Sequence, residues 1–228
     1  MSERCPYDTC DGSGFVFDDA TNTAYDCRCR AARIVMAKAR SLSAVIPKRY
    51  RDVGFDRWPV TEIDPPIVAA TRRFADSIDP KLDAGRGLWF MGEVGTGKTT
   101  LAMLVSKAAL EAGRSVAIYS LPRLLNEIRD THRAERSHVD PLDRLTAVDL
   151  LHIDDVGAER STDWVLEELY SIVNARYEDE RSMVITTNIV DHEALCEQIA
   201  ERTVSRLTEM CDQLPLGGED KRTVLRSA

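Results

Sequence analysis

The sequence predicts an α/β domain with a parallel sheet, preceded by a small hairpin that holds most of the cysteines. Three observations lead to this expectation. From residue 67 onward, apolar runs of strand length alternate with runs of helical periodicity, a pattern typical of parallel sheets. One apolar run leads directly into a glycine-rich loop and then into a helical run. Four of the six cysteines lie within the first 29 residues.

Length and composition limit the classes of protein to consider. A chain of 228 residues accommodates one full α/β domain and a small appendage. The net charge of −8 argues against a protein covered by nucleic acid, although a local basic surface is compatible with it. There is no apolar run of membrane-spanning length and no apolar core of a signal peptide. We therefore expect a cytoplasmic protein without a membrane partner.

The N-terminal cysteines bracket a short hairpin pattern, with strands expected at 15–17 and 23–25 and a turn between them. About thirty residues cannot bury enough apolar surface to fold alone, so a structural ion is expected. Four thiolates suit zinc in a closed tetrahedral site. The expected zinc ligands are Cys5, Cys10, Cys27 and Cys29. Spacers of four and one residues differ from the usual pair of two-residue spacers, so a redox pair or four free thiols remain alternatives.

A basic amphipathic helix is expected next, at residues 30–46. Apolar residues at helical spacing form one stripe, and Arg30, Arg33 and Arg40 lie on the opposite face. This face is either a solvated surface or a docking surface for an acidic partner or for nucleic-acid phosphates. Pro47 ends the helix. We expect three parts: the hairpin and basic helix at 1–46, a linker at 47–66 and a core at 67–228.

The glycine-rich loop has the pattern of a phosphate-binding loop, Gly92-x-x-x-x-Gly97-Lys98-Thr99, between an expected strand at 88–91 and an expected helix at 100–110. Its glycines let the backbone turn so that successive N–H groups face bound phosphates, and the helix adds the positive end of its dipole. Lys98 would reach the β- and γ-phosphates, and the hydroxyl of Thr99 would ligate magnesium. The expected nucleotide contacts are Gly92, Gly95, Thr96, Gly97, Lys98, Thr99 and Thr100. The sequence therefore predicts a nucleoside triphosphate site with Mg²⁺.

An apolar run at 148–155 ends in two carboxylates, Asp154 and Asp155. A strand that ends in this way is what the second half of a nucleotide site requires. We expect Asp154 to hold the magnesium and Asp155 to polarise the water that attacks the γ-phosphate. The simpler alternative is that both residues form a turn. His152, in the middle of the strand, is expected to be a core histidine.

The alternation of helices and strands continues after the loop. Further strands are expected at 115–119 and 182–188, and helices at 121–130 and from residue 163 onward. Asn188, at the tip of the last of these strands, would orient the attacking water or cap the turn. The helix from residue 163 carries an expected core stripe of Leu166, Leu169, Tyr170, Val173 and Tyr177. A basic cluster of Arg129, His132, Arg133 and Arg136 is either a solvated surface or a contact for a nucleic-acid strand.

Taken together, the chain resembles the AAA+ ATPases of the bacterial helicase-loader group (DnaC/DnaI type) and their relatives, the IstB-type transposition helpers. The resemblance covers roughly residues 46 to 222. The residues that carry it are IPKRYRDVGFD from Ile46, GEVGTGKTTLA from Gly92, LLHIDDVGAE from Leu150, ITTN from Ile185 and SRL from Ser205.

The resemblance implies a core with a five-stranded parallel sheet flanked by helices. It implies that Asn188 is sensor 1 and that Arg206 is an arginine finger that reaches the ATP of a neighbouring subunit. Arg202, one helical turn earlier, is a rival for that role. Arg222 would be a second sensor. Because little chain remains after Met210, we expect a shortened lid, which leaves the second sensor and a free-standing oligomer as open questions.

The resemblance implies a helicase loader that binds a replicative DNA helicase hexamer and delivers it to single-stranded DNA, with ATP as the switch. Some loaders carry a zinc element that engages the helicase, whereas IstB-type proteins have a metal-free N-terminal region. One alternative function is an IstB-like helper that acts on duplex DNA with a transposase. Another is a small-molecule kinase, which the paired aspartates and the SRL residues disfavour.

Overall fold

The computed structural model describes residues 5–18, 21, 23–30, 46–133 and 145–218. The expected basic helix at 30–46, including Arg33 and Arg40, lies almost wholly outside the described residues. Arg136 and the expected second sensor, Arg222, also lie outside them. No helix in the described part is long and apolar enough to span a membrane.

The core is built on a five-stranded sheet in which every neighbouring pair is parallel, in the order β4-β5-β6-β3-β7. The strands are β3 Gly87–Gly92, β4 Val116–Ser120, β5 Leu150–Val156, β6 Ser182–Thr187 and β7 Cys211–Leu216. The expected fold class, a parallel five-stranded sheet flanked by helices, is confirmed. Because all strands run the same way, their carboxyl ends meet at one edge of the sheet, where the loops after β3, β5 and β6 lie side by side.

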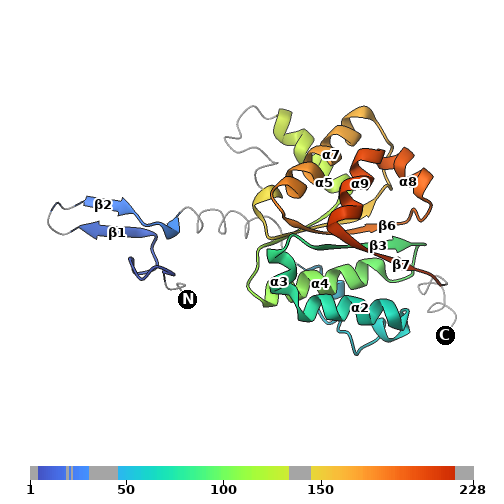
Figure 1. Cartoon of the computed structure of the whole chain (residues 1–228), viewed down its shortest axis with the longest axis horizontal. Helices are drawn as coiled ribbons and strands as arrows, with labels where there is room; N and C mark the ends of the chain where they lie inside the picture. Colours follow the sequence, from blue (N-terminus) through green and yellow to red (C-terminus); the bar gives the residue numbers. More distant parts are fainter. Residues whose placement is uncertain (1–4, 19–20, 22, 31–45, 134–144, 219–228) are drawn as a thin grey trace.

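Helices cover both faces of this sheet (Figure 1). On one face lie α2 Pro65–Asp76, α3 Ile78–Asp83 and α4 Lys98–Glu111. On the other lie α5 Leu121–Arg133, α7 Asp163–Glu178, α8 His192–Ile199 and α9 Glu201–Met210. Each face of the sheet has its own buried apolar cluster, so the strands are apolar on both sides.

The fifth strand, β7, has no clear strand pattern in the sequence. It is an edge strand that pairs only with β3, and only its first and last residues are buried. Pro215 is tolerated there because an edge strand has one unpaired side. The strand follows α9 directly, and its register with β3 places Leu216 beside Gly92.

Helix α7 buries a face that matches the expected core stripe only in part. Its buried positions are Val165, Leu169, Ile172, Val173 and Arg176, whereas Leu166, Tyr170 and Tyr177 are only half-buried. The expected stripe is confirmed at Leu169 and Val173, and Tyr177 packs against the same core cluster, whereas Leu166 and Tyr170 do not belong to it. The buried Arg176 donates hydrogen bonds to the carbonyls of Leu145 (2.5 Å), Val148 (3.0 Å) and Ser182 (2.7 Å). It therefore ties the end of α7 to the segment before β5 and to the start of β6.

The segment expected to be a linker packs against the core. It contains two short 3-10 helices, η1 Lys48–Tyr50 and η2 Val60–Glu62. Val60 and Ile63 are buried in the same apolar cluster as α2 and α4. Lys107 of α4 donates to the backbone carbonyl of Arg51 at 3.2 Å.

The N-terminal hairpin forms as expected. Strands β1 Phe15–Asp18 and β2 Thr23–Asp26 pair antiparallel, with Phe15 opposite Asp26. The hairpin has its own small buried cluster, made of the cysteines and Val16. Figure 1 shows it as a unit separate from the core.

Candidate nucleotide-binding site

The loop between β3 and α4 needs glycine at three positions. Gly92, Gly95 and Gly97 have φ angles of 151°, 82° and 104°, which side-chain-bearing residues rarely adopt. A Cβ at Gly97 would lie 2.4 Å from the Cδ1 atom of Ile63, and a Cβ at Gly92 would lie 2.1 Å from the Leu216 carbonyl oxygen. The loop is therefore fitted between β7 on one side and the pre-core segment on the other.

Lys98, at the first position of α4, lies at the centre of this loop and is only 5% exposed. Its Nζ donates to the carbonyl oxygens of Gly92 (2.8 Å) and Glu93 (2.7 Å). The hydroxyl of Thr96 donates to the same Glu93 carbonyl at 2.9 Å. The ammonium group is thus held against the backbone of the loop, in the position from which the lysine of such a loop reaches a β- or γ-phosphate.

The two halves of the expected magnesium site meet at Asp154. The hydroxyl of Thr99 donates to Asp154 Oδ1 at 2.9 Å, so the structure brings together the two predicted magnesium ligands. The hydroxyl of Thr186, at the end of β6, donates to the same oxygen at 2.7 Å. A hydroxyl and a carboxylate in contact beside a phosphate-binding loop form a donor set of the kind that Mg²⁺ takes.

Asp155 has a backbone conformation that separates its role from that of Asp154. Its φ is 58°, in the left-handed region, and the pairing of β5 with β6 is irregular between Ile153 and Val156. Its backbone N–H donates to the hydroxyl of Thr186 at 2.8 Å. This irregularity breaks the simple alternation of a strand, in which successive side chains point to opposite faces. Thr186 therefore orders both aspartates, a role that the sequence did not reveal.

Asn188 is exposed and follows β6 directly, at the same edge of the sheet as the two aspartates. The residue before it, Thr187, is buried and donates its hydroxyl to the Val156 carbonyl at 2.7 Å. The turn is closed by the N–H of Ile189, which donates to the Thr187 hydroxyl at 3.2 Å. Since Thr187 supplies the cap, the turn does not need Asn188 for that purpose.

Glu159 is a further acidic residue near the site, and our sequence analysis did not assign it a role. Its Oε1 accepts from the N–H of Gly157 at 3.2 Å, and its carbonyl accepts from Gln198 of α8 at 2.5 Å. Burial, aided by the charge of Asp155, raises the pKa of the Glu159 carboxyl, although nearby backbone N–H groups oppose this. The only sequence signal was its place in the LLHIDDVGAE run.

His152 is a core residue, as expected, and lies under the site rather than in it. It is fully buried, and its Nδ1 lies 2.9 Å from the hydroxyl of Ser106 on α4. The Ser106 hydroxyl also lies 3.1 Å from the Ala102 carbonyl, to which it can donate. Burial lowers the pKa of His152 to about 3, so the ring is neutral.

Arg202 and Arg206 lie on α9 and are both stacked on tyrosines of α7 in the same chain. The guanidinium carbon of Arg202 is 3.9 Å from the centre of the Tyr170 ring. That of Arg206 is 4.9 Å from the centre of Tyr170 and 5.4 Å from that of Tyr177. The predicted finger is therefore held on the helical layer of its own subunit, where no contact with Lys98 or Asp154 of that subunit is seen among the described residues.

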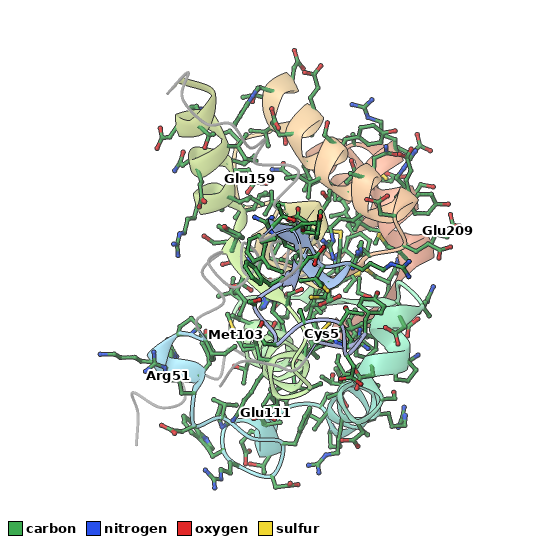
Figure 2. All side chains as sticks on the ribbon, turned by 90° about the vertical axis from the view of Figure 1, so that its left-hand side faces the viewer. Cys5, Arg51, Met103, Glu111, Glu159 and Glu209 are labelled. Atoms are coloured by element: carbon green, nitrogen blue, oxygen red, sulfur yellow. The ribbon has the colours of Figure 1, made fainter. Side chains whose placement is uncertain are left out.

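The four N-terminal cysteines form one cluster, with all their sulfur atoms within 4.8 Å of one another. Cys5, Cys27 and Cys29 are buried, and Cys10 is half-buried. The hydroxyl of Thr9 lies 3.0 Å from the sulfur of Cys27. Four thiols converging on one point in a unit this small fit a tetrahedral zinc ion. Figure 2, viewed from the hairpin side, labels Cys5 in front of the core.

Comparisons with known proteins agree with this geometry. The model of the family described as IstB-like ATP binding protein matches residues 78–228. The replicative helicase loader DnaC of Buchnera aphidicola subsp. Acyrthosiphon pisum (strain APS) is 24% identical over 165 residues, which cover 71% of this chain and 65% of that relative. The chain thus spans less than two thirds of this relative's length.

Two solved structures are also similar. A crystal structure of the DnaC helicase loader superposes with a TM-score of 0.63 and 27% identity, covering 75% of this chain and 99% of that chain. A crystal structure of DnaI superposes with a TM-score of 0.55 and 21% identity, covering 80% of this chain and 93% of that chain. The second likeness concerns the fold alone. The resemblance that the sequence motifs indicated is confirmed.

Proposed function

We propose, because this chain belongs to the family of IstB-like ATP binding proteins, that it is an ATP-dependent loader of a replicative DNA helicase. Its core is that of an AAA+ P-loop ATPase. The observation that carries the loader proposal is the likeness to the solved DnaC loader, which this chain covers over 99% of its length. In this proposal the protein binds the helicase hexamer and delivers it to single-stranded DNA.

The nucleotide site supports ATP hydrolysis by residues that the fold brings to one edge of the sheet. The backbone N–H groups of the loop and Lys98 would hold the β- and γ-phosphates. Thr99 and Asp154 would hold Mg²⁺, which neutralises charge on the phosphate oxygens. Asp155 would accept a hydrogen bond from the attacking water, with Asn188 to orient it. The water oxygen would form a bond to the γ-phosphorus and pass a proton to Asp155 as the bond from that phosphorus to the bridging oxygen breaks, and ADP and phosphate would leave.

Lys98 gives this site a way to act as a switch. In the structure its ammonium is hydrogen-bonded to the carbonyls of Gly92 and Glu93. A γ-phosphate would compete with these carbonyls for the same protons, and that contact is lost after hydrolysis. The loop and the strand end at Asp154 are linked through Thr99, so the change at the phosphate reaches β5 and β6.

The division of the chain supports separate duties for its parts. In our proposal the zinc hairpin and the basic segment, residues 1–46, hold the helicase, whereas the core at 67–228 carries ATP and single-stranded DNA. Zinc would be held by the four clustered cysteines and would stabilise the hairpin. Copies of the chain would meet so that Arg206 reaches the nucleotide of a neighbour.

The experiment that tests this proposal is co-migration of the purified protein with a replicative helicase hexamer on a sizing column, with ATP and with ADP. We expect a complex, and we expect it to transfer the hexamer onto single-stranded DNA only with ATP. Lys98→Ala should still bind the hexamer but should fail to transfer it. A chain that binds no replicative helicase under any nucleotide condition is not a loader.

A second candidate is a transposition helper, which is favoured by the IstB-like family that the chain belongs to. It predicts ATP-dependent binding to duplex DNA and to a transposase, and no complex with the helicase. A small-molecule kinase, in contrast, would need an acceptor for turnover. Hydrolysis of ATP in the absence of any added acceptor separates the ATPase from the kinase.

A further inference from the structure

Outside the nucleotide site, two half-buried tyrosines of α7 lie against charged residues of α9. Tyr170 and Tyr177 are seven residues apart, and Arg202, Arg206 and Glu209 are spaced four and three apart. Both spacings place their residues on one face of a helix. We call these five residues the tyrosine–arginine ladder. Figure 2 labels Glu209 at the outer side of the molecule.

The rings of the ladder are held from both helices. Tyr170 contacts both guanidinium groups, and Tyr177 contacts that of Arg206 alone. The pKa of Tyr177 is raised, mainly because its hydroxyl is hydrogen-bonded to the carboxylate of Glu209. Arg206 therefore contacts two rings, and one of them, Tyr177, is in turn hydrogen-bonded to α9. The exposed Arg202 contacts one ring.

The stacking leaves the hydrogen-bond donors of both arginines unused. Among the described residues, no carboxylate lies within ion-pair distance of Arg202 or Arg206. The Nε of Arg206 is buried and has no acceptor there. A ring occupies only the face of a guanidinium, and its N–H groups lie in the plane of the group, where they match two phosphate oxygens.

Each ring contact is favourable, but hydrogen bonding and charge act against this arrangement. A buried donor without an acceptor disfavours folding. Two guanidinium groups one helical turn apart also repel each other. A bound phosphate would offset both effects, because it would supply acceptors and negative charge at once.

We propose that Tyr170 and Tyr177 are positioning residues that hold the Arg206 guanidinium for the terminal phosphate of a nucleotide bound to a neighbouring copy. This inference rests on the proposed role of Arg206 in trans. It assigns the finger role to Arg206 and leaves Arg202 as a second cation on the shared ring. The rings restrict the many rotamers of a long side chain, so the neighbour's site meets a pre-oriented donor pair.

The test is complementation between subunits of the full-length chain, at concentrations where light scattering shows assembly, with the helicase hexamer present if it promotes assembly. Lys98→Ala subunits have a dead site but a normal ladder. Tyr170→Leu subunits have a normal site but a loosened ladder. We expect Tyr170→Leu to lower kcat about fivefold, the size of a stacking contact, with an unchanged KM for ATP. When Tyr170→Leu subunits are mixed with Lys98→Ala subunits, the rate per intact nucleotide site should return toward the wild-type value, because the normal ladder of a Lys98→Ala subunit then faces a normal site.

Conservative variants separate positioning from folding. Tyr170→Phe and Tyr177→Phe keep the rings and should retain most of the rate. Tyr177→Leu should behave like Tyr170→Leu and replaces it if that variant does not fold, as judged by thermal melting. Arg206→Ala should lower the rate by far more, on the order of a thousandfold, and should also be rescued by Lys98→Ala subunits.

Each outcome decides a specific point. If Arg206→Ala is rescued in mixtures and the tyrosine variants either keep the wild-type rate or are not rescued, the positioning role is wrong and the role in trans stands. If Arg206→Ala does not lower the rate of assembled protein, the role in trans is wrong as well. A chain that stays monomeric with and without the helicase overturns both. Unchanged hydrolysis with weakened single-stranded DNA binding would assign the arginines to nucleic-acid phosphates instead.

Discussion

Asp154 is the residue through which the phosphate loop, β5 and β6 are connected. One of its carboxylate oxygens accepts hydrogen bonds from both Thr99 and Thr186. Its neighbour Asp155 is turned into a left-handed conformation at a register irregularity. Two adjacent carboxylates therefore have different surroundings, which is the physical basis for giving them different roles.

Lys98→Ala should abolish ATP hydrolysis and weaken ATP binding. The variant removes the charge that meets the β- and γ-phosphates and leaves the Gly92 carbonyl without the Lys98 donor, whereas the Glu93 carbonyl still accepts from Thr96. Titration with a fluorescent ATP analogue and a phosphate-release assay measure the two effects. Lys107→Ala, on the same helix but bonded to the pre-core segment, is the matched control and should retain both activities. Equal losses in the two variants would point to damage to α4 rather than to the site.

Asp155→Asn should spare ATP binding and slow hydrolysis on the order of a hundredfold, because the metal ligand Asp154 remains and the water loses its acceptor. Asp154→Asn should instead weaken the dependence of binding on Mg²⁺. Single-turnover kinetics at saturating ATP separates the two variants. If Asp155→Asn hydrolyses ATP at the wild-type rate, our assignment of the two acids is wrong, and Glu159→Gln becomes the variant to measure next.

Acidification should destabilise the protein through His152. The pKa of this fully buried ring is lowered from 6.5 to about 3. Below pH 6.5, His152 therefore becomes protonated in the unfolded chain but stays neutral in the native state. The stability due to neutral His152 is complete above pH 6.5 and is lost as the pH falls toward 3, by about 1.4 kcal/mol per pH unit. Between pH 7.5 and 5 this amounts to about 2 kcal/mol.

Urea unfolding at several pH values tests this. His152→Gln keeps a donor for Ser106 but cannot titrate, so its stability should fall less than that of the wild type over this range, by about 2 kcal/mol. Identical pH profiles for the wild type and His152→Gln would show that the buried ring does not contribute.

At the scale of elements, the phosphate loop and its flanking strand and helix could be predicted because each is specified locally. Three glycines with positive φ angles, an apolar strand and a helix start all lie within one short stretch. Both aspartates could be placed at a strand end for the same reason. The contact between Thr99 and Asp154 follows from the parallel topology, which aligns the ends of β3 and β5 across the intervening β6.

What the sequence did not reveal depends on which elements become neighbours. The tyrosines of α7 fit an apolar stripe, and only the packing of α9 against them shows that they contact Arg202 and Arg206. Strand β7 lacks a strong pattern because it is an edge strand. Thr186 is a residue type that is common in strands. It orders the two aspartates only because β6 lies beside β5.

The hairpin should lose its fold when its metal is removed. Cys27→Ser should release one zinc ion per chain and unfold residues 5–30, because the hairpin's buried cluster consists of little more than the cysteines and Val16. ATP binding by the core should survive. Elemental analysis and proteolysis of the N-terminus are the measurements, and Cys196→Ser, outside the cluster, is the control. Wild-type protein without stoichiometric metal would contradict this prediction.

At the scale of the whole molecule, the hairpin and the core differ in what they expose. The hairpin carries four of the large apolar side chains that are exposed in the described part of the chain: Tyr7, Phe15, Phe17 and Tyr25. Phe15 and Phe17 alternate with the inward-facing Val16, so they lie on one face of the hairpin. In our proposal zinc stabilises the hairpin, so these rings are not needed in a core. Arg30 covers one face of the Phe15 ring, and Phe17 is the more exposed of the two phenylalanines.

Deletion of the N-terminal part should separate the two duties of the molecule. The cut is best placed after residue 45, because Ile46 packs partly against the core and its carbonyl accepts from Arg51. Without residues 1–45, ATP binding and basal hydrolysis should persist, since the nucleotide site draws all its described contacts from residue 63 onward. Co-migration with the helicase should be lost.

Point variants test the same division in the full-length chain. Phe17→Ser, on the exposed face of the hairpin, should weaken helicase binding by about thirtyfold while zinc and ATP binding persist, since burial of a large apolar side chain is worth about 2 kcal/mol. Charge reversal at Arg33 and Arg40 should weaken the complex more at low salt than at high salt, because screening reduces an exposed charge contact. Trp58→Ser, an exposed aromatic residue of the pre-core segment, is the control for a general loss of apolar surface. If the chain lacking residues 1–45 binds the helicase as tightly as the full chain, the partner contacts the core, and the hairpin has another function.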